Sequence, residues 1–315
     1  MLRVSDTLVR TINLVHYQQT NFMGRLHGGD MLKFLADAGM LASMKVGKGL
    51  AVLASLDEVL FKRGANLGDI VTVDARVLYI GKTSMEVEMI ARRGSETIVT
   101  ATGTYVKVDN KFRPAPVGDI VVPETEEERE AVAKAMKRRE VKVNKLKNKN
   151  TMRICSNDPT NFLRHRLSNT TFVGPTMTYD GSVVSAGALL KAMDDLGGTL
   201  ALRYNGIDHY SPKQDGVVTV AVSDIFFYSP IRLGDIIEMN AGLTFVGKTS
   251  MDILINVNRL NMENQECSHV TTAYFSYVRV DPEGRKKEVP IYIPENEYEV
   301  ELWKESARRR GAVSS

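Results

Sequence analysis

The stretch Tyr79-Ile-Gly-Lys-Thr-Ser-Met85 returns later in the chain as Phe245-Val-Gly-Lys-Thr-Ser-Met251, at an offset of 166 residues. Two further pairs repeat in the same order, the first at 166 and the second at 172: Leu67–Ile70 with Leu233–Ile236, and Thr104–Asp109 with Ser276–Asp281. Small drifts in the offset are what loop insertions cause. A collinear series of matches indicates a tandem duplication, and this repeat decides the architecture.

Each half is expected to contain one helix followed by a run of strands. Small and apolar residues recur at helical spacing from Leu32 to Met40, and the second half repeats this pattern from Leu189 to Leu200. Period-two alternation follows, for example over 71–79, and it predicts an antiparallel sheet with one face in water. The predicted fold class is α+β, a tandem arrangement in which each half is a long central helix wrapped by a curled antiparallel sheet.

The length of 315 residues suits two domains. The repeat places the first domain at 1–123 and the second at 161–315, the second with a solvated C-terminal tail that carries Arg308 to Arg310. The charged linker 124–160 begins acidic and ends basic, which complements a helix dipole. Two interpretations of this linker stay open: a solvent-exposed helix, or a docking surface for phosphates.

Composition excludes several classes of protein. Lys+Arg 41 against Asp+Glu 38 leaves a net charge of only +3, so no nucleic-acid partner is predicted. Five His and two Cys leave little material for a metal site, and none is expected. Two cysteines are too few for a disulfide framework and are typical of a reducing compartment. No apolar run approaches the ~18 residues that span a bilayer, and the N-terminus lacks a signal-peptide pattern, so we expect a cytoplasmic protein with no membrane partner.

The loop from Gln19 to Lys33 carries the clearest chemical pattern. It ends in His27-Gly28-Gly29 and at once opens the first helix. Glycines let a ligand approach the backbone closely, and the unpaired N–H groups of a first helical turn suit an oxyanion. The same residues equally suit a structural cap, and His27 can either bond the backbone or touch a substrate.

Asn-x-x-Gly-x-x-His-Gly-Gly before a small-residue helix resembles the hotdog-fold acyl-CoA thioesterases, here with Asn21 and Gly24 as its first members. Phe227–Asp235 and Val246–Ser250 resemble two later signatures of that family. The resemblance is closest to the double-hotdog subgroup of cytosolic and brain-type acyl-CoA hydrolases. It implies a tandem hotdog fold that hydrolyses acyl-CoA to a free carboxylic acid and CoA, with no cofactor apart from the CoA of the substrate. It also implies a homo-oligomer, a trimer of double hotdogs.

In that family the active site forms where two hotdogs pack, and a motif Asp or Asn positions the hydrolytic water. The matched Asp position holds Gln19 in the first half and Met177 in the second. Substitute carboxylates are Asp180, in the second loop, and Asp37 and Asp195, which align with each other on the two helices. These helical carboxylates could also be structural, paired in the interface. The catalytic candidates are Asn21, Asp37, Asp180 and Asp195.

The two Gly-Lys-Thr-Ser turns are either bare hairpin turns or grips for phosphate, and the resemblance places this turn near the nucleotide of CoA. The substrate-binding candidates are therefore His27, Gly28, Gly29, Lys82, Thr83, Ser84, Lys248, Thr249 and Ser250.

Two functions stay open. The first is acyl-CoA thioesterase, and the second is a non-catalytic acyl-CoA-binding protein on a degenerate hotdog scaffold, motivated by the absent motif Asp. The halves also differ: Asn21 and Gly28-Gly29 face Tyr179 and Ala186-Gly187 in the repeat. We expect one working site per chain, built around the first loop, with Gly29→Val abolishing activity and Gly187→Val largely sparing it.

Overall fold

The computed structural model describes residues 1–57, 59–145, 155, 158–209, 211, 213–223 and 225–313. Its helices are α1 (Gly28–Gly47), α2 (Glu126–Lys145), α4 (Ala186–Tyr204) and α5 (Glu297–Val313), with short 3-10 turns at Ser5–Thr7, Tyr17–Gln19 and Pro175–Met177. The strands of the first half are β1 (Leu2–Arg3), β2 (Val9–Leu14), β3 (Ala51–Leu56), β4 (Val59–Phe61), β5 (Ile70–Ile80), β6 (Ser84–Arg93), β7 (Glu96–Lys107) and β8 (Val121–Val122). Those of the second half are β9 (Arg166–Phe172), β10 (Gly216–Ser223), β11 (Ile225–Phe226), β12 (Ile236–Val246), β13 (Ser250–Leu260) and β14 (Cys267–Val280).

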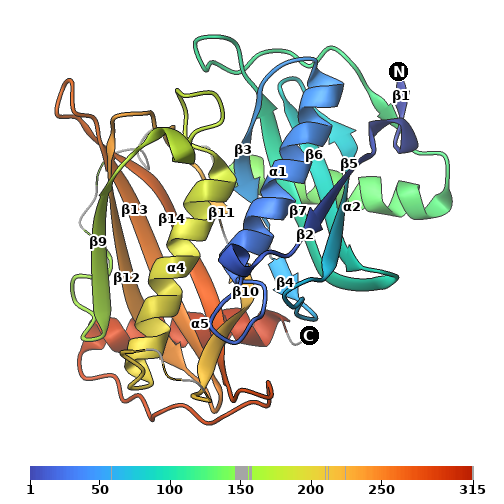
Figure 1. The fold of residues 1–315 in the computed structure, drawn as a ribbon. Helices are drawn as coiled ribbons and strands as arrows, with labels where there is room; N and C mark the ends of the chain where they lie inside the picture. Colours follow the sequence, from blue (N-terminus) through green and yellow to red (C-terminus); the bar gives the residue numbers. More distant parts are fainter. Residues whose placement is uncertain are drawn as a thin grey trace.

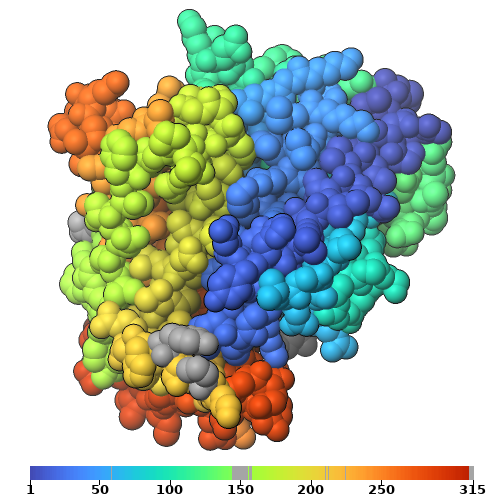
Figure 2. Space-filling model, in the orientation of Figure 1, coloured from blue at the N-terminus to red at the C-terminus, as the bar shows by residue number. Residues whose placement is uncertain are grey.

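The two halves share one twelve-stranded sheet, in which ten strands follow the path β2-β5-β6-β7-β4-β10-β14-β13-β12-β9, and β3 and β11 lie off this path. β4 pairs with β10 across the halves, with Leu60 opposite Ala221, and β11 pairs with β3, with Ile225 opposite Leu56. Helices α1 and α4 lie side by side in front of the sheet (Figure 1). In the space-filling view the halves meet along one continuous seam (Figure 2). The predicted α+β class with a tandem hotdog arrangement is confirmed.

Each central helix is held to its sheet by a buried tyrosine. The Tyr105 hydroxyl of β7 donates to the carbonyl of Ala36 at 2.9 Å, and Tyr277 of β14 occupies the same place beneath α4. A Cβ on Gly39 would lie 2.3 Å from the Tyr105 oxygen, and one on Gly197 2.4 Å from the Tyr277 oxygen. The small residues that the repeat preserves therefore let each helix approach its sheet closely.

The expectation that one sheet face lies in water holds only in part, because each half carries an outer helix over a portion of that face. Helix α2 covers Glu86, and Lys142 is buried with its Nζ 3.0 Å from Glu86 Oε2 and 2.9 Å from Thr104 Oγ1. In the second half, Arg310 of α5 takes the place of Lys142 and binds Asp252, with its Nε 2.8 Å from Oδ2. The linker is helical over Glu126–Lys145 as predicted, but its inner face packs on the sheet. Arg310 belongs to a docked helix rather than to a solvated tail.

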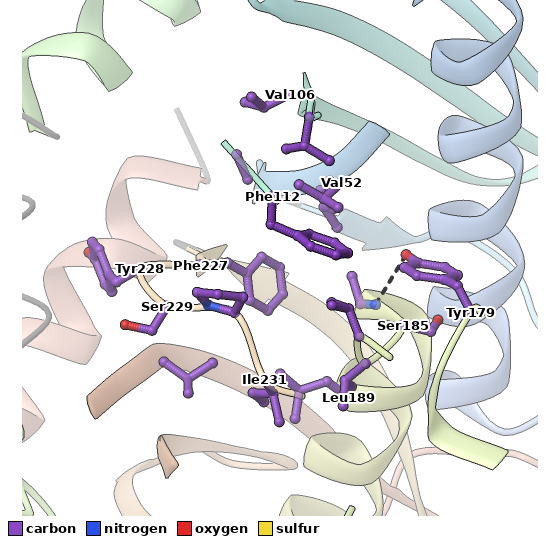
Figure 3. A pocket seen from close by; sticks show the side chains of 18 of the residues that line it. Val52, Val106, Phe112, Tyr179, Ser185, Leu189, Phe227, Tyr228, Ser229 and Ile231 are labelled. Atoms are coloured by element: carbon purple, nitrogen blue, oxygen red, sulfur yellow. Dashed lines mark hydrogen bonds between the residues drawn. The ribbon is translucent and has the colours of Figure 1, made fainter. Parts of the chain in front are cut away.

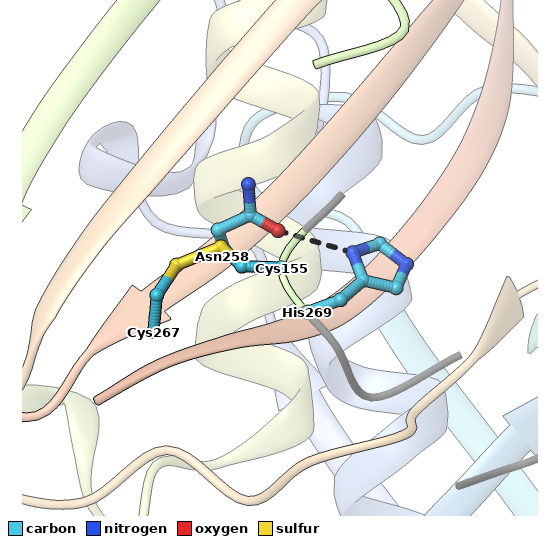
Figure 4. Close-up of a disulfide and its surroundings, with 4 residues drawn as sticks. All are labelled: Cys155, Asn258, Cys267 and His269. Atoms are coloured by element: carbon cyan, nitrogen blue, oxygen red, sulfur yellow. Dashed lines mark hydrogen bonds between the residues drawn. A yellow bond between two sulfur atoms is a disulfide. The ribbon is translucent and has the colours of Figure 1, made fainter. Parts of the chain in front are cut away.

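Cys155 and Cys267 form a disulfide across 112 residues of sequence, with 5.6 Å between their Cα atoms (Figure 4). The bond attaches the segment before β9 to the start of β14, near a hydrogen bond of 3.2 Å between His269 Nδ1 and Asn258 Oδ1. The expectation of two reduced cysteines is therefore wrong. The two residues lie 112 positions apart, so no local sequence pattern indicates that folding brings them together. Among the described residues no helix has both the length and the apolar character that crossing a bilayer requires.

Candidate active site

Asn21 organises the first-half loop that precedes α1. Its side-chain Oδ1 accepts hydrogen bonds from the backbone N–H groups of Met23, at 3.0 Å, and Arg25, at 3.1 Å. Two backbone donors on Oδ1 fix the orientation of the amide, so that its Nδ2 protons remain available to a ligand. Asn21 lines a pocket of about 390 Å³ between the halves.

His27 is the N-cap of α1. Its Nδ1 accepts from the N–H of Gly29 at 3.2 Å, which satisfies one donor of the first helical turn. Because Nδ1 is the acceptor, the neutral ring carries its proton on Nε2. That atom points across the interface to α4, 3.4 Å from Asp194 Oδ2 and 3.6 Å from Asp195 Oδ1. His27 thus bonds the backbone, and it also lines the pocket at Asn21.

Asp194 is fully buried on α4, and its carboxylate accepts hydrogen bonds from two hydroxyl groups. Thr219 of β10 donates its hydroxyl to Oδ1 at 2.8 Å, and Tyr277 donates to the same oxygen at 3.0 Å. Burial and the neighbouring carboxylate raise the pKa of the Tyr277 phenol well above its usual range, so the tyrosine remains a donor. A buried charge is tolerated only with such partners. The second half thus brings a carboxylate to the first-half loop.

Asp195, the next residue of α4, lines the pocket itself and its side chain is 55% exposed. Desolvation raises the pKa of its carboxyl, while the charges of His27 and Lys191 oppose that shift. Of the four catalytic candidates from the sequence, the structure brings Asn21 and Asp195 to the same pocket.

Asp37 and Asp180 lie elsewhere. Asp37 forms an ion pair with Lys33 on its own helix at 2.5 Å, and does not line the pocket at Asn21. Asp180 is exposed in the second-half loop, where its Oδ1 accepts from the Ser182 N–H at 2.9 Å and hydroxyl at 2.6 Å. These bonds lower the pKa of Asp180, as expected of a carboxylate in an Asx turn.

The two opening glycines of α1 serve different purposes. A Cβ on Gly28 would lie 2.4 Å from Thr219 Oγ1 and 2.9 Å from Asp194 Oδ2, so this glycine leaves room at the carboxylate. A Cβ on Gly29 would instead meet the Lys191 backbone at 2.8 Å, and one on Gly187 the Lys33 backbone at 3.0 Å. Gly29 and Gly187 are therefore equivalent contacts where α1 crosses α4. The expected contrast between valine substitutions at these two positions does not follow from this packing.

The pseudo-symmetric position holds a second pocket, of about 260 Å³, on the other side of the helix pair. Tyr179 and Ser185 replace Asn21 and His27 there, and the Tyr179 hydroxyl accepts from the N–H of Ala186 at 3.3 Å (Figure 3). Ala36 stands where α4 has Asp194. Leu53 stands opposite Tyr105 in the sheet, as Thr219 stands opposite Tyr277. The second pocket thus lacks the counterparts of Asp194 and Thr219, while Tyr105 keeps the place of Tyr277.

The Gly-Lys-Thr-Ser turns join β5 to β6 and β12 to β13 as hairpins. Thr83 lines the second pocket, while neither Lys82 nor Ser84 is among its lining residues. Lys248 pairs with Glu288 at 3.3 Å, and the Ser250 hydroxyl accepts from Arg310 at 2.7 Å. None of the six Lys, Thr and Ser residues of the two turns, Thr249 included, lines the pocket at Asn21.

Sequence reasoning missed Asp194, Thr219 and Tyr277. It searched for residues that the halves share, which singled out Asp37 and Asp195. The signal that was available is a difference between the halves. Asp194 occupies an apolar position of α4, one turn after Leu190, where the matching position of α1 is an alanine. Within the described ranges, no three His, Cys, Asp or Glu side chains gather closely enough to hold a metal ion.

Comparison with known proteins agrees with this geometry. The model of the thioesterase superfamily matches residues 23–100 and 181–264, one segment in each half. The cytosolic acyl coenzyme A thioester hydrolase of Homo sapiens is 27% identical over 95% of this chain and 81% of its own. An uncharacterized acyl-CoA thioester hydrolase of Bacillus subtilis is 24% identical over 46% of this chain and 79% of its own. The crystal structure of an acyl-ACP thioesterase from Bacteroides thetaiotaomicron has a similar fold, with a TM-score of 0.54 at 11% identity over 88% of this chain and 100% of that one.

A pocket formed jointly by two helix-and-sheet units is typical of thioesterases with the hotdog fold. The chain belongs to the thioesterase superfamily and contains two copies of its domain.

Proposed function

We propose that this chain hydrolyses acyl-CoA thioesters to a free carboxylic acid and CoA. One observation carries the proposal: the Asn21 loop and the N-terminus of α1 face a buried carboxylate, Asp194, from the other half. The relatives named as acyl-CoA thioester hydrolases support the substrate class.

The hydrolytic water is activated by Asp194 acting through Thr219. The Thr219 hydroxyl donates to Asp194 and also lines the pocket, so its oxygen can accept a proton from water as its own proton passes to the carboxylate. The water oxygen attacks the thioester carbonyl carbon and forms a tetrahedral intermediate. The C–S bond then breaks, and the proton returns from Asp194 to the leaving sulfur, which gives the free thiol of CoA.

The oxyanion of that intermediate is stabilised from the first half. Gly28 lines the pocket in the first turn of α1, whose N–H groups have no intrahelical partner. The Nδ2 of Asn21 supplies a second donor. Fixed donors aimed at a developing oxyanion are each worth roughly 3 kcal/mol of barrier. His27, whose Nε2 faces Asp194, positions the carboxylate.

Asp195 is the alternative base. It is exposed to the pocket, and its raised pKa suits proton transfer. We favour Asp194 because Thr219 and Tyr277 hold its carboxylate in one orientation, whereas the Asp195 side chain is 55% exposed and approaches His27 Nε2 at 3.6 Å.

Thiol release from acyl-CoAs of increasing chain length tests the function. We expect turnover in wild type and its loss in Asp194→Asn, with Asp195→Asn retaining at least a tenth of the rate. Tight CoA binding without any turnover would instead support a non-catalytic acyl-CoA-binding protein.

We also propose that the chain forms a trimer of double hotdogs. The outermost strands expose apolar side chains that association would cover, among them Ile12 (69%) on β2 and Phe172 (63%) on β9. Light scattering that finds one chain per particle would contradict the trimer.

A further inference from the structure

We propose that the second pocket binds a free fatty acid without reacting with it. The site lies between the halves, on the side of the helix pair opposite Asp194, and shares no lining residue with the pocket at Asn21. It would give the chain two unlike sites, one that cleaves an acyl thioester and one that holds an acyl chain.

The lining of this pocket is uncharged as far as the structure describes it. Its walls come from apolar side chains of both halves, including Val52, Leu189, Phe227 and Ile231 (Figure 3), and none of the described lining residues is Asp, Glu, Lys, Arg or His. The catalytic pocket, in contrast, is lined by Arg25, His27, Lys62, Arg63 and Asp195. An uncharged cavity of about 260 Å³ is larger than one that takes benzene, and it excludes a phosphate-bearing group from its interior.

Phe112 gives the pocket an aromatic wall at a cost to the backbone. Its φ is 57°, in the left-handed region that a bulky side chain rarely adopts. In the equivalent turn of the second half this position is Gly284, with φ 88°. In both turns the backbone N–H of this residue donates to the carbonyl of the Asp three positions earlier. The first half thus keeps a strained phenylalanine where glycine would be relaxed, and such strain marks functional positions.

The Phe112 ring reaches into the pocket beside Phe227 (Figure 3), and the Arg232 guanidinium of the other half lies 5.7 Å from its centroid. The aromatic face of Phe112 closes one side of the cavity, and the cation that lies over its ring is not itself a lining residue. The strained side chain therefore shapes the cavity rather than the turn.

The choice of a fatty acid rests on the proposed function, because this pocket holds the place of an acyl-binding site and hydrolysis releases that product. Thr83, Tyr179 and Ser185 line this pocket, and their hydroxyl groups can form hydrogen bonds with the carboxyl group of a fatty acid. With Ala36 and Leu53 in place of Asp194 and Thr219, the described residues of this pocket lack the carboxylate and hydroxyl pair to which we assign the activation of water.

Two matched variants separate the pockets. Val52 lines the second pocket and Val218, its equivalent in the repeat, lines the catalytic one. Binding of decanoic acid is followed by isothermal titration calorimetry, and turnover by thiol release from decanoyl-CoA. We expect Val218→Trp to lower turnover at least tenfold and still bind one decanoic acid per chain. Val52→Trp should keep turnover within twofold, and the double variant should bind at least tenfold more weakly than Val218→Trp.

Equal binding by Val218→Trp and the double variant would overturn the proposal. An inactive wild type with the binding result intact would count against the proposed function alone. Should Val52→Trp not fold, Phe112→Gly in the Val218→Trp background serves instead, because glycine accepts the left-handed backbone. It should weaken decanoic acid binding at least threefold while preserving the melting temperature, and unchanged affinity would overturn the proposal.

Discussion

The Nε2 atom of His27, at the start of α1, lies 3.4 Å from Oδ2 of Asp194 on α4. This contact joins the loop of the first half to the carboxylate of the second. The sister positions hold Ser185 and Ala36, so the second half of the repeat has no equivalent of this contact.

Replacing His27 separates its two tasks. Asn is a good N-cap, so His27→Asn should preserve the helix start while losing the contact with Asp194. We expect kcat/KM about tenfold lower with the melting temperature nearly unchanged. His27→Ala should lose a further ~1 kcal/mol of stability in chemical denaturation. Full activity in His27→Asn would show that the contact with Asp194 has no part in catalysis.

Gly28 and Gly29 should respond in opposite ways to alanine. Gly28→Ala places a methyl group against Thr219 and Asp194, so kcat should fall about a hundredfold. Gly29→Ala drives against the Lys191 backbone and should destabilise the protein by roughly 1–3 kcal/mol. Ala186→Gly is the control for the second pocket and should leave turnover within twofold. Similar profiles of activity and melting temperature for the two alanine variants would contradict this division.

Asp195 should reduce stability near neutral pH. Its pKa is raised in the folded state, so folding takes up protons, and stability falls as pH rises from its unfolded value through the raised one. Asp195→Asn should therefore melt higher than wild type at pH 7, and the difference should vanish below about pH 4. A difference that stays constant across this pH range would contradict the shift.

The disulfide makes a simple chemical prediction. Cys267 is exposed, so a reduced chain would offer a reactive thiol to Ellman's reagent. The untreated, denatured protein should show no free thiol, and two after reduction. Two thiols without reduction would rule out the bond between Cys155 and Cys267.

Much of the fold was predictable from the sequence because a duplication writes the same pattern twice. Asn21, His27 and Gly28 were identified at their place around the start of α1, since capping and close approach depend on neighbouring residues. Asp194 was not identified, because its role depends on Thr219, which the sheet brings to it from another element. The burial of Lys142 was not predicted for the same reason, because only the folded chain brings α2 against Glu86. The domain boundaries at 123 and 161 stay a prediction.

The measurement that tests the composite site most directly is kcat/KM for acyl-CoA in two matched pairs of variants. Asn21→Ala and Asp194→Asn alter the first pocket, while Tyr179→Phe alters the counterpart of Asn21 and Asp37→Asn the counterpart of Asp195. We predict losses of at least a hundredfold, about 2.7 kcal/mol of transition-state stabilisation, for the first pair and less than twofold for the second. Comparable losses in the two pairs, or full activity in Asp194→Asn, would contradict a single working site between Asn21 and Asp194.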